Sequence, residues 1–284
     1  MNNIFNIRRF GLVFRKDFME NGKRYALLFL TMLGIMAIVS IFMSLNYYEL
    51  YLNRSDIYDL NEHNKQLLIS LSFAFIAGGL LFSSTFMAPM NSKLKRLSYL
   101  SNPSSNLEKF LTRWIIVTIG YIIAFFVAMW IADVLRVAVI SAKYPDLEIK
   151  FLDLSKLYDT EGSRFYMIPK VVFTIFLFII FLFQSLFILG ATFFEKMSFL
   201  KTFVTISILT YVFIMFWRFS IFIFYEDGLD GLGNVLGSFF ENKTNEENEQ
   251  LLKLVAYSAL SVFTLASWVL AFFRFRESEI NKRL

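Results

Sequence analysis

Few side chains in this sequence could support catalysis or hold a metal ion. The chain has one histidine, His63, and no cysteine. His63 stands beside Glu62 and Asn64 in a polar stretch between two apolar segments, where we expect a solvated side chain. Intramembrane enzymes need histidines, paired carboxylates or a bound metal inside the bilayer. The residue types therefore predict a protein that is not an enzyme and that holds no metal or cofactor.

A phosphate-binding loop is also missing from the sequence. No G-x-x-x-x-G-K-[ST] pattern occurs in the chain. The glycines between residues 228 and 237 have the wrong spacing and no preceding strand, and we interpret them as a flexible loop or as an element that dips into the membrane surface. ATP used by this protein would have to be bound by a separate subunit.

A few polar side chains fall inside or at the ends of apolar segments. Asp133 and Arg136 are three residues apart, so we expect them to pair at the membrane interface, with proton coupling by Asp133 as the alternative. Gln184 and Gly78–Gly79 are typical of helix packing, although they could equally line a substrate path. Arg218 interrupts its apolar segment, and we expect its guanidinium to reach the headgroups, the alternative being a buried functional charge.

The elements that carry these residues are membrane spans. Hydrophobic residues make up 57% of the 284 positions, above the roughly 45 to 50% of an average soluble domain. About 20 apolar residues in a helix cross the hydrocarbon core of a bilayer. The sequence predicts an all-α integral membrane protein with six transmembrane helices, at residues 25–45, 67–90, 114–132, 171–194, 202–225 and 254–273.

The distribution of charge predicts the orientation of these spans. Lys and Arg are retained on the cytoplasmic side, and most of them lie in residues 1–24, 91–113 and 195–201 and in the basic tail 274–284. Loops 46–66 and 226–250 are rich in acid, and loop 137–170 is mixed. Both termini are therefore expected inside, and the net charge of +5 reflects topology, not nucleic-acid binding.

The stretch before the first span, residues 1–24, has the pattern of an amphipathic interfacial helix. Phe10 and Phe14 belong to an apolar stripe, while the basic residues Arg8, Arg9, Arg15 and Lys16 lie elsewhere around the helix. We expect this elbow helix to lie along the inner leaflet and to contact membrane lipid. A basic anchor that only fixes topology is the compatible alternative.

The segment between the second and third spans, residues 91–113, combines a helix breaker with a helix start. Pro103 ends one segment. Ser105 and Glu108 have the spacing of a capping box, so a new helix is predicted to begin there. Glu108, Lys109 and Arg113 would then lie near the cytoplasmic interface, before Trp114 enters the bilayer.

The sequence Pro-Ser-Ser-Asn-Leu-Glu-Lys-Phe-Leu-Thr-Arg, from Pro103 to Arg113, resembles the Pro-Ala-Ser-x-x-Glu-Lys-Phe-Leu-x-Arg signature of ABC-2-type permeases from Bacteroidota. Ser104 replaces the usual Ala. Residues Phe5 to Asn21 are similar to the elbow helix of that family, whose members also have six spans with both termini inside.

The resemblance implies a protein of the bacterial cytoplasmic membrane that forms a dimer with a second permease chain, identical or related. It further implies that a separate ATP-binding subunit grips the elbow and a coupling helix. The coupling residues would be Pro103, Ser104, Ser105, Asn106, Glu108, Lys109 and Arg113.

Three functions remain open on the sequence. The leading hypothesis is the membrane subunit of an ABC-type exporter. The second is a stand-alone six-span protein of the same ancestry, such as an immunity, assembly or sensing factor. The third, a single-chain secondary transporter, is disfavoured because few ionisable residues lie at the centre of the spans. Lipid-like, peptide and drug-like substrates are all compatible with the sequence.

Overall fold

The structure is a computed structural model, and it describes residues 5–53, 60–90, 99, 103–147, 149–154, 170–194, 196–224 and 245–281. Within these ranges the regular elements are all helices. The predicted loops 46–66, 91–113, 137–170 and 226–250 therefore fall partly outside the described residues. The glycines between 228 and 237 lie wholly outside them.

Six helical stretches are long and apolar enough to cross a membrane, as the apolar runs predicted. The elements in chain order are α1 (Ile7–Asn53), α2 (Leu60–Ser83), the short 3-10 helix η1 (Ala88–Met90), α4 (Asn106–Ile115), the π-helical turn η2 (Ile116–Gly120), α5 (Tyr121–Lys143), α6 (Lys170–Phe193), α7 (Ser198–Phe224) and α9 (Asn245–Asn281). Exposed large apolar side chains are spread along these helices, α7 above all, which suits a multi-pass membrane protein.

Helix boundaries differ from the apolar runs in several places. The region predicted as elbow and first span forms one continuous helix, α1. The α-helix in the second run ends at Ser83, and the chain continues through turns into η1, which contains Pro89. Helices α5 and α9 extend into the stretches predicted as loops 137–170 and 226–250.

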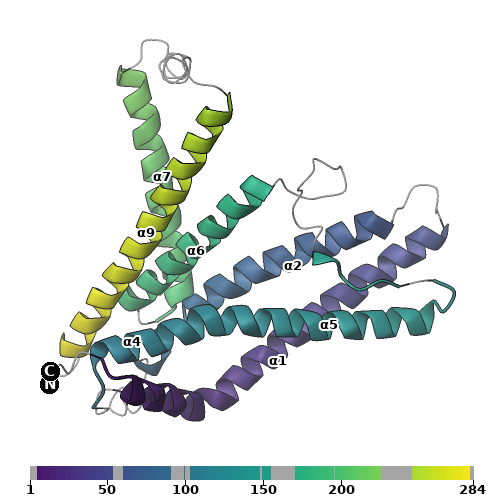
Figure 1. Cartoon of the computed structure of the whole chain (residues 1–284), viewed down its shortest axis with the longest axis horizontal. Coiled ribbons are helices and arrows are strands. Elements are labelled where there is room, and N and C mark those ends of the chain that lie inside the picture. The colour runs from purple at the N-terminus through teal and green to yellow at the C-terminus, as the bar shows by residue number, and fades with distance from the viewer. Residues whose placement is uncertain are drawn as a thin grey trace.

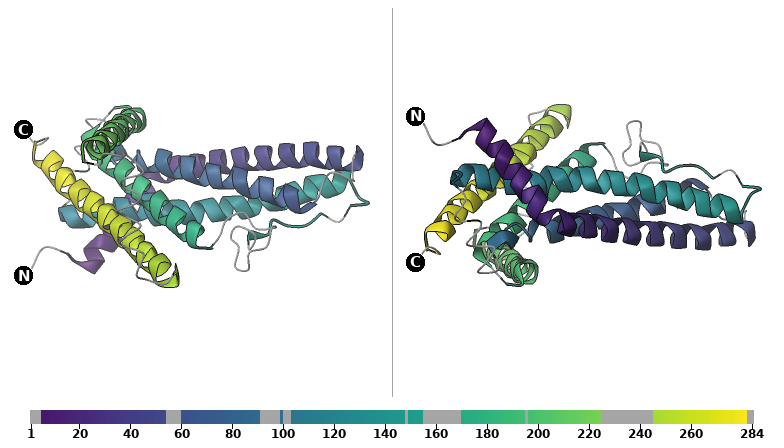
Figure 2. Two further views of the ribbon diagram at one scale, coloured as in Figure 1. Left: turned by 90° about the horizontal axis from the view of Figure 1, so that it is seen from above. Right: turned by 90° about the horizontal axis from the view of Figure 1, so that it is seen from below.

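The helices form two groups that meet at one end of the molecule. Figure 1 shows α1, α2 and α5 running together in one direction, and α6, α7 and α9 in another. The start of α1, all of α4 and the end of α9 lie where the groups converge, and we call this the terminal end (Figures 1 and 2). The opposite end of α1, α2 and α5 is called the far end.

Each group has an apolar core of its own. Between α1, α2 and α5 the core is built around Met36, Tyr121 and Phe125. At the terminal end, Phe86, Phe110 and other buried residues from α4, α6, α9 and the turn after α2 form the second core. Helix α4 takes part in the second core and runs through η2 into α5, so it joins the two groups.

Candidate functional site

The predicted capping box starts α4. The Ser105 hydroxyl accepts a hydrogen bond from the Glu108 N–H at 3.3 Å, and the Glu108 carboxylate accepts one from the Ser105 N–H at 3.0 Å. These bonds satisfy two backbone donors that a helix start leaves unpaired. The prediction of a helix beginning after Ser105 is therefore confirmed.

Glu108 ties α4 to the first residues of the chain. Its side chain is fully buried and accepts hydrogen bonds from the Arg9 Nε at 2.7 Å and from the Asn6 N–H at 2.8 Å. Burial raises the pKa of this carboxyl group, which lies before the predicted third span, but the bonds from Arg9, Asn6 and Ser105 outweigh burial and hold the pKa below its ordinary value. Glu108 is therefore an ionised part of the fold.

Arg113 ties α4 to both α1 and the end of α2. One terminal nitrogen lies 3.4 Å from the Asp17 carboxylate and donates to the Tyr25 hydroxyl at 2.6 Å, and that hydroxyl donates to Asp17 at 2.7 Å. The other guanidinium nitrogens donate to the Phe86 and Thr85 carbonyls at 3.2 and 3.1 Å. A buried cation thus reaches carbonyl groups just past a helix C-terminus, where positive charge is favourable.

The remaining predicted coupling residues divide into buried and accessible groups. Lys109 is buried, and its ammonium nitrogen lies 5.3 Å from the centre of the Tyr99 ring. Pro103 is exposed, and Ser104, Ser105 and Asn106 are half-buried. The charged residues of α4 therefore contact their own chain, and the accessible surface of this segment is centred on Pro103.

The predicted elbow residues also differ in how exposed their side chains are. Arg8 and Arg15 are exposed, whereas Arg9, Phe10, Phe14 and Lys16 are half-buried. The face of α1 that packs against the protein includes Val13 and Asp17, four and eight residues after Arg9. The position of this stretch relative to a membrane remains a prediction.

Aromatic contacts join α4 to α9. The ring of Phe110 lies 5.4 Å from Phe272 and 5.8 Å from Phe275, and Trp114 meets Trp268 edge-on at 5.1 Å. Helix α4 thus contacts α1, the turn after α2, and α9 within ten residues. It therefore joins α1, the turn after α2 and α9 at the terminal end.

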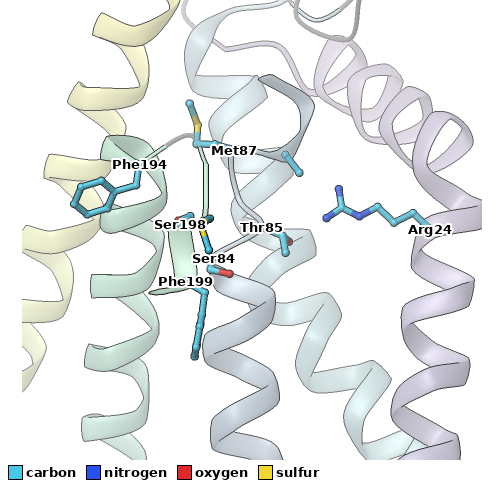
Figure 3. Close-up of a pocket in the computed structure, with 9 residues that line it drawn as sticks. Arg24, Ser84, Thr85, Met87, Phe194, Ser198 and Phe199 are labelled. Carbon is cyan, nitrogen blue, oxygen red and sulfur yellow. The ribbon is translucent and has the colours of Figure 1, made fainter. Parts of the chain in front are cut away.

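A hollow of about 260 Å³ lies at the terminal end, between α1, the turn after α2 and the start of α7. Figure 3 shows Arg24 extending from α1 toward Thr85, with Ser198 and Phe199 of α7 on the other side. Arg24 is the charged residue of the described lining. The hollow separates the start of α7 from α1 at the terminal end.

The far end contains a buried polar cluster that the sequence did not predict. His63 is 3% exposed, so the expectation of a solvated side chain was wrong. Its ring stacks on Tyr47 with centroids 4.5 Å apart, and its Nε2 lies 3.0 Å from the Ser44 hydroxyl. His63 is buried because the two helices extend beyond the apolar runs: α1 continues to Asn53, after the first run, and α2 begins at Leu60, before the second.

Asp133 and Arg136 form the ion pair expected from their spacing. The Arg136 Nε donates to Asp133 at 2.7 Å, and Asp133 also accepts the Leu152 N–H at 2.9 Å. Arg136 is buried and donates to the Lys150 carbonyl at 2.9 Å. The pair fastens the chain after α5 back onto that helix, which is a structural role.

Gln184 and Arg218, the other polar candidates, lie apart from this pair. Gln184 is buried on α6, and its amide nitrogen lies 3.4 Å from the Val117 carbonyl in η2, so it packs α6 against the start of the third span. Arg218 lies exposed on α7. The structure therefore does not bring Asp133, Gln184 and Arg218 into one site.

The residues that sequence reasoning missed are the partners of the buried charges. Asp17 and Tyr25 complete the Arg113 cluster, and Asn6 completes that of Glu108. One signal was present in the sequence. Asp17 is an acidic residue in a basic stretch, at helical spacing from Arg9, and could have been matched to a basic residue elsewhere.

The described residues define a multi-pass membrane protein built of helices. Arg9, Asp17, Glu108 and Arg113 form a buried ionic junction at the terminal end, where the start of α1 and the end of α9 lie. Comparisons with protein-family models, curated proteins and solved structures find no match. The permease resemblance of Pro103–Arg113 and of the N-terminal stretch is thus carried by those residues alone.

Proposed function

We propose that this chain is the membrane subunit of an ABC-type exporter that works with a separate ATP-binding subunit and a second permease chain in a bacterial cytoplasmic membrane. The observation that carries the proposal is the position of α4. It bears the permease-like sequence, contacts α1, the turn after α2, and α9, and runs into α5. A force applied to this helix by a partner would move both helix groups.

The ionic contacts make the terminal end suitable for transmitting such a force. Glu108 and Arg113 are buried charges, and each is held by several partners in the chain. Breaking a buried pair is costly, so α4 and the start of α1 would move as one unit. In this proposal the partner contacts exposed residues of that unit, among them Arg8, Arg15 and Pro103.

A stand-alone membrane protein of the same ancestry is the second candidate. The observation that favours it is the burial of Glu108, Lys109 and Arg113, because these charges are fully explained by contacts within the chain. A protein that had lost its ATP-binding partner would keep them for stability alone.

Co-purification from the native host tests the proposal. The tagged chain is extracted in mild detergent, and ATP hydrolysis is measured in the eluate for the wild type, Arg8→Glu and Arg15→Glu. Lys143→Glu is the matched control, since it reverses an exposed basic residue at the far end of α5. We expect an ATP-binding subunit with the wild type and with Lys143→Glu, and its loss in at least one of the other variants.

Two other results would count against the proposal. Recovery of the chain without ATPase activity under several mild extraction conditions would favour the stand-alone protein. Equal recovery of the ATPase with all variants would place its contact away from the start of α1.

A further inference from the structure

An apolar cavity of about 350 Å³ lies between α2, α5 and α6. Its lining shares no residue with the ionic contacts of α4. Figures 1 and 2 show that α6 runs away from α5. Side chains of all three helices line it, among them Leu71, Ile76, Ile122, Phe126, Leu177 and Phe181. None of the described lining residues is charged.

Two hydroxyl groups and one amide nitrogen of the lining have hydrogen-bond acceptors within the chain. The Ser72 hydroxyl donates to the Leu68 carbonyl at 2.8 Å, and the Tyr121 hydroxyl donates to the Phe75 carbonyl at 2.7 Å. The Gln184 amide nitrogen points to the Val117 carbonyl at 3.4 Å. These three groups therefore need no polar partner from an occupant of the cavity, whose lining is otherwise almost entirely apolar.

The cavity lies at the depth of the hydrocarbon core if these helices span a bilayer. Its lining comes from the middle of three helices that are long and apolar enough to cross a membrane. Most of the lining side chains are only half-buried, and Phe126 is 47% exposed, so the cavity is open at its side. At this depth a bilayer offers hydrocarbon chains and essentially no water.

The cavity is large enough for an apolar occupant. Apolar cavities of about 150 Å³ already bind small apolar molecules and exclude water. A hydrocarbon chain is the apolar group that the surrounding bilayer supplies, and in its extended form it is thin enough to enter a cavity of about 350 Å³ from the side.

We propose that this cavity binds one acyl chain of a membrane lipid, which enters from the bilayer between α5 and α6. The inference does not depend on an ATP-binding partner, because it rests on the cavity alone. A bound chain would replace missing protein contacts and support the angle between the two helix groups.

Native mass spectrometry of the purified full chain tests the proposal, with dioleoyl-phosphatidylethanolamine as the probe lipid. Leu177→Trp fills the cavity from α6, and Leu209→Trp places the same side chain on α7, where Leu209 is 62% exposed. We expect the wild type and Leu209→Trp to retain one lipid after detergent exchange, and Leu177→Trp to retain about tenfold less. Absence of a retained lipid in the wild type, or equal retention in the two variants, would overturn the proposal.

A second measurement on the unmodified chain covers the case in which Leu177→Trp fails to fold. A phosphatidylethanolamine with a diazirine in the middle of one acyl chain is irradiated with the wild type, and labelled residues are identified. Labelling of Ile122, Phe126 and Leu177 that saturates and exceeds labelling of Leu209 and Phe213 supports the cavity. Labelling that is equal to or weaker than that of α7 contradicts it.

Discussion

The guanidinium group of Arg113 is surrounded by acceptors from separate parts of the chain. Asp17 and Tyr25 approach it from α1, and the carbonyls of Thr85 and Phe86 approach it from the turn after α2. A buried charge is tolerated only when it is paired and hydrogen-bonded. The ion pair joins residues 96 positions apart in sequence, so the terminal end depends on long-range pairing.

Replacement of Arg113 by alanine should destabilise the protein strongly. The substitution leaves the Asp17 carboxylate buried without its cation, which typically costs roughly 3–5 kcal/mol. We expect a clearly lower thermal unfolding temperature in detergent for Arg113→Ala. The double variant Arg113→Ala with Asp17→Asn should lose less than the sum of the two single variants, because the charge left behind is removed.

Glu20→Gln is the matched control for this ionic cluster. Glu20 pairs with Lys16 on the exposed side of the same helix, with the charged atoms 3.7 Å apart. Exposed pairs of this kind contribute about 0.3–0.5 kcal/mol. Equal losses for Glu20→Gln and Arg113→Ala would mean that the Arg113 cluster does not support the fold.

At the scale of the elements, two glycines on α2 allow α5 to approach closely. A Cβ atom added at Gly78 would lie 2.6 Å from the Tyr121 hydroxyl, and one added at Gly79 would lie 3.2 Å from the Tyr121 ring. The hydroxyl is held in place by its bond to the Phe75 carbonyl. Small residues let membrane helices pack closely, which is the role expected from the sequence for this pair.

Gly78→Ala should therefore destabilise the packing of α2 on α5. Overpacking of this kind costs roughly 1–3 kcal/mol, because Tyr121 must give up its position. Tyr121→Phe in the same chain should restore part of the loss, since it removes the atom that the new methyl group meets. Thermal unfolding of the single and double variants measures both effects.

Gly34→Ala provides the control for helix propensity. Gly34 lies within α1, and a Cβ added there meets nothing within 4 Å. Alanine is favoured over glycine in a helix by roughly 0.5–1 kcal/mol, so this variant should be neutral or more stable. A loss for Gly34→Ala as large as that for Gly78→Ala would contradict the packing explanation.

The sequence predicted elements better than it predicted contacts. Apolar runs are local, and each of the six led to a membrane-length helix; the capping box at Ser105 is also local and is present. The charged partners of Glu108 and Arg113, Arg9 and Asp17, lie 99 and 96 residues away, and no local pattern specifies them. His63 was misjudged for the same reason, because its burial depends on Ser44 and Tyr47 from another helix.

At the scale of the whole molecule, the two helix groups share the terminal end and separate away from it (Figure 1). Helix α4 packs in the terminal core and continues into α5, which forms part of the other core, and α2 also packs against α6. In the proposed topology the terminal end faces the cytoplasm, where the basic segments are concentrated. The far end of α5 would then face the outside.

Cysteine labelling tests this topology directly, because the chain has no cysteine of its own. Four exposed residues serve as positions for single substitutions: Arg8→Cys and Arg276→Cys at the terminal end, and Lys143→Cys and Asp146→Cys at the far end of α5. With a membrane-impermeant maleimide, intact cells should label the far-end variants alone, and the other two should react only after the membrane is opened. The unsubstituted chain, which cannot react, sets the background. Labelling of Arg8→Cys or Arg276→Cys in intact cells would reverse the orientation and place the α4 junction out of reach of any cytoplasmic ATP-binding subunit, and the proposed function would fail with it.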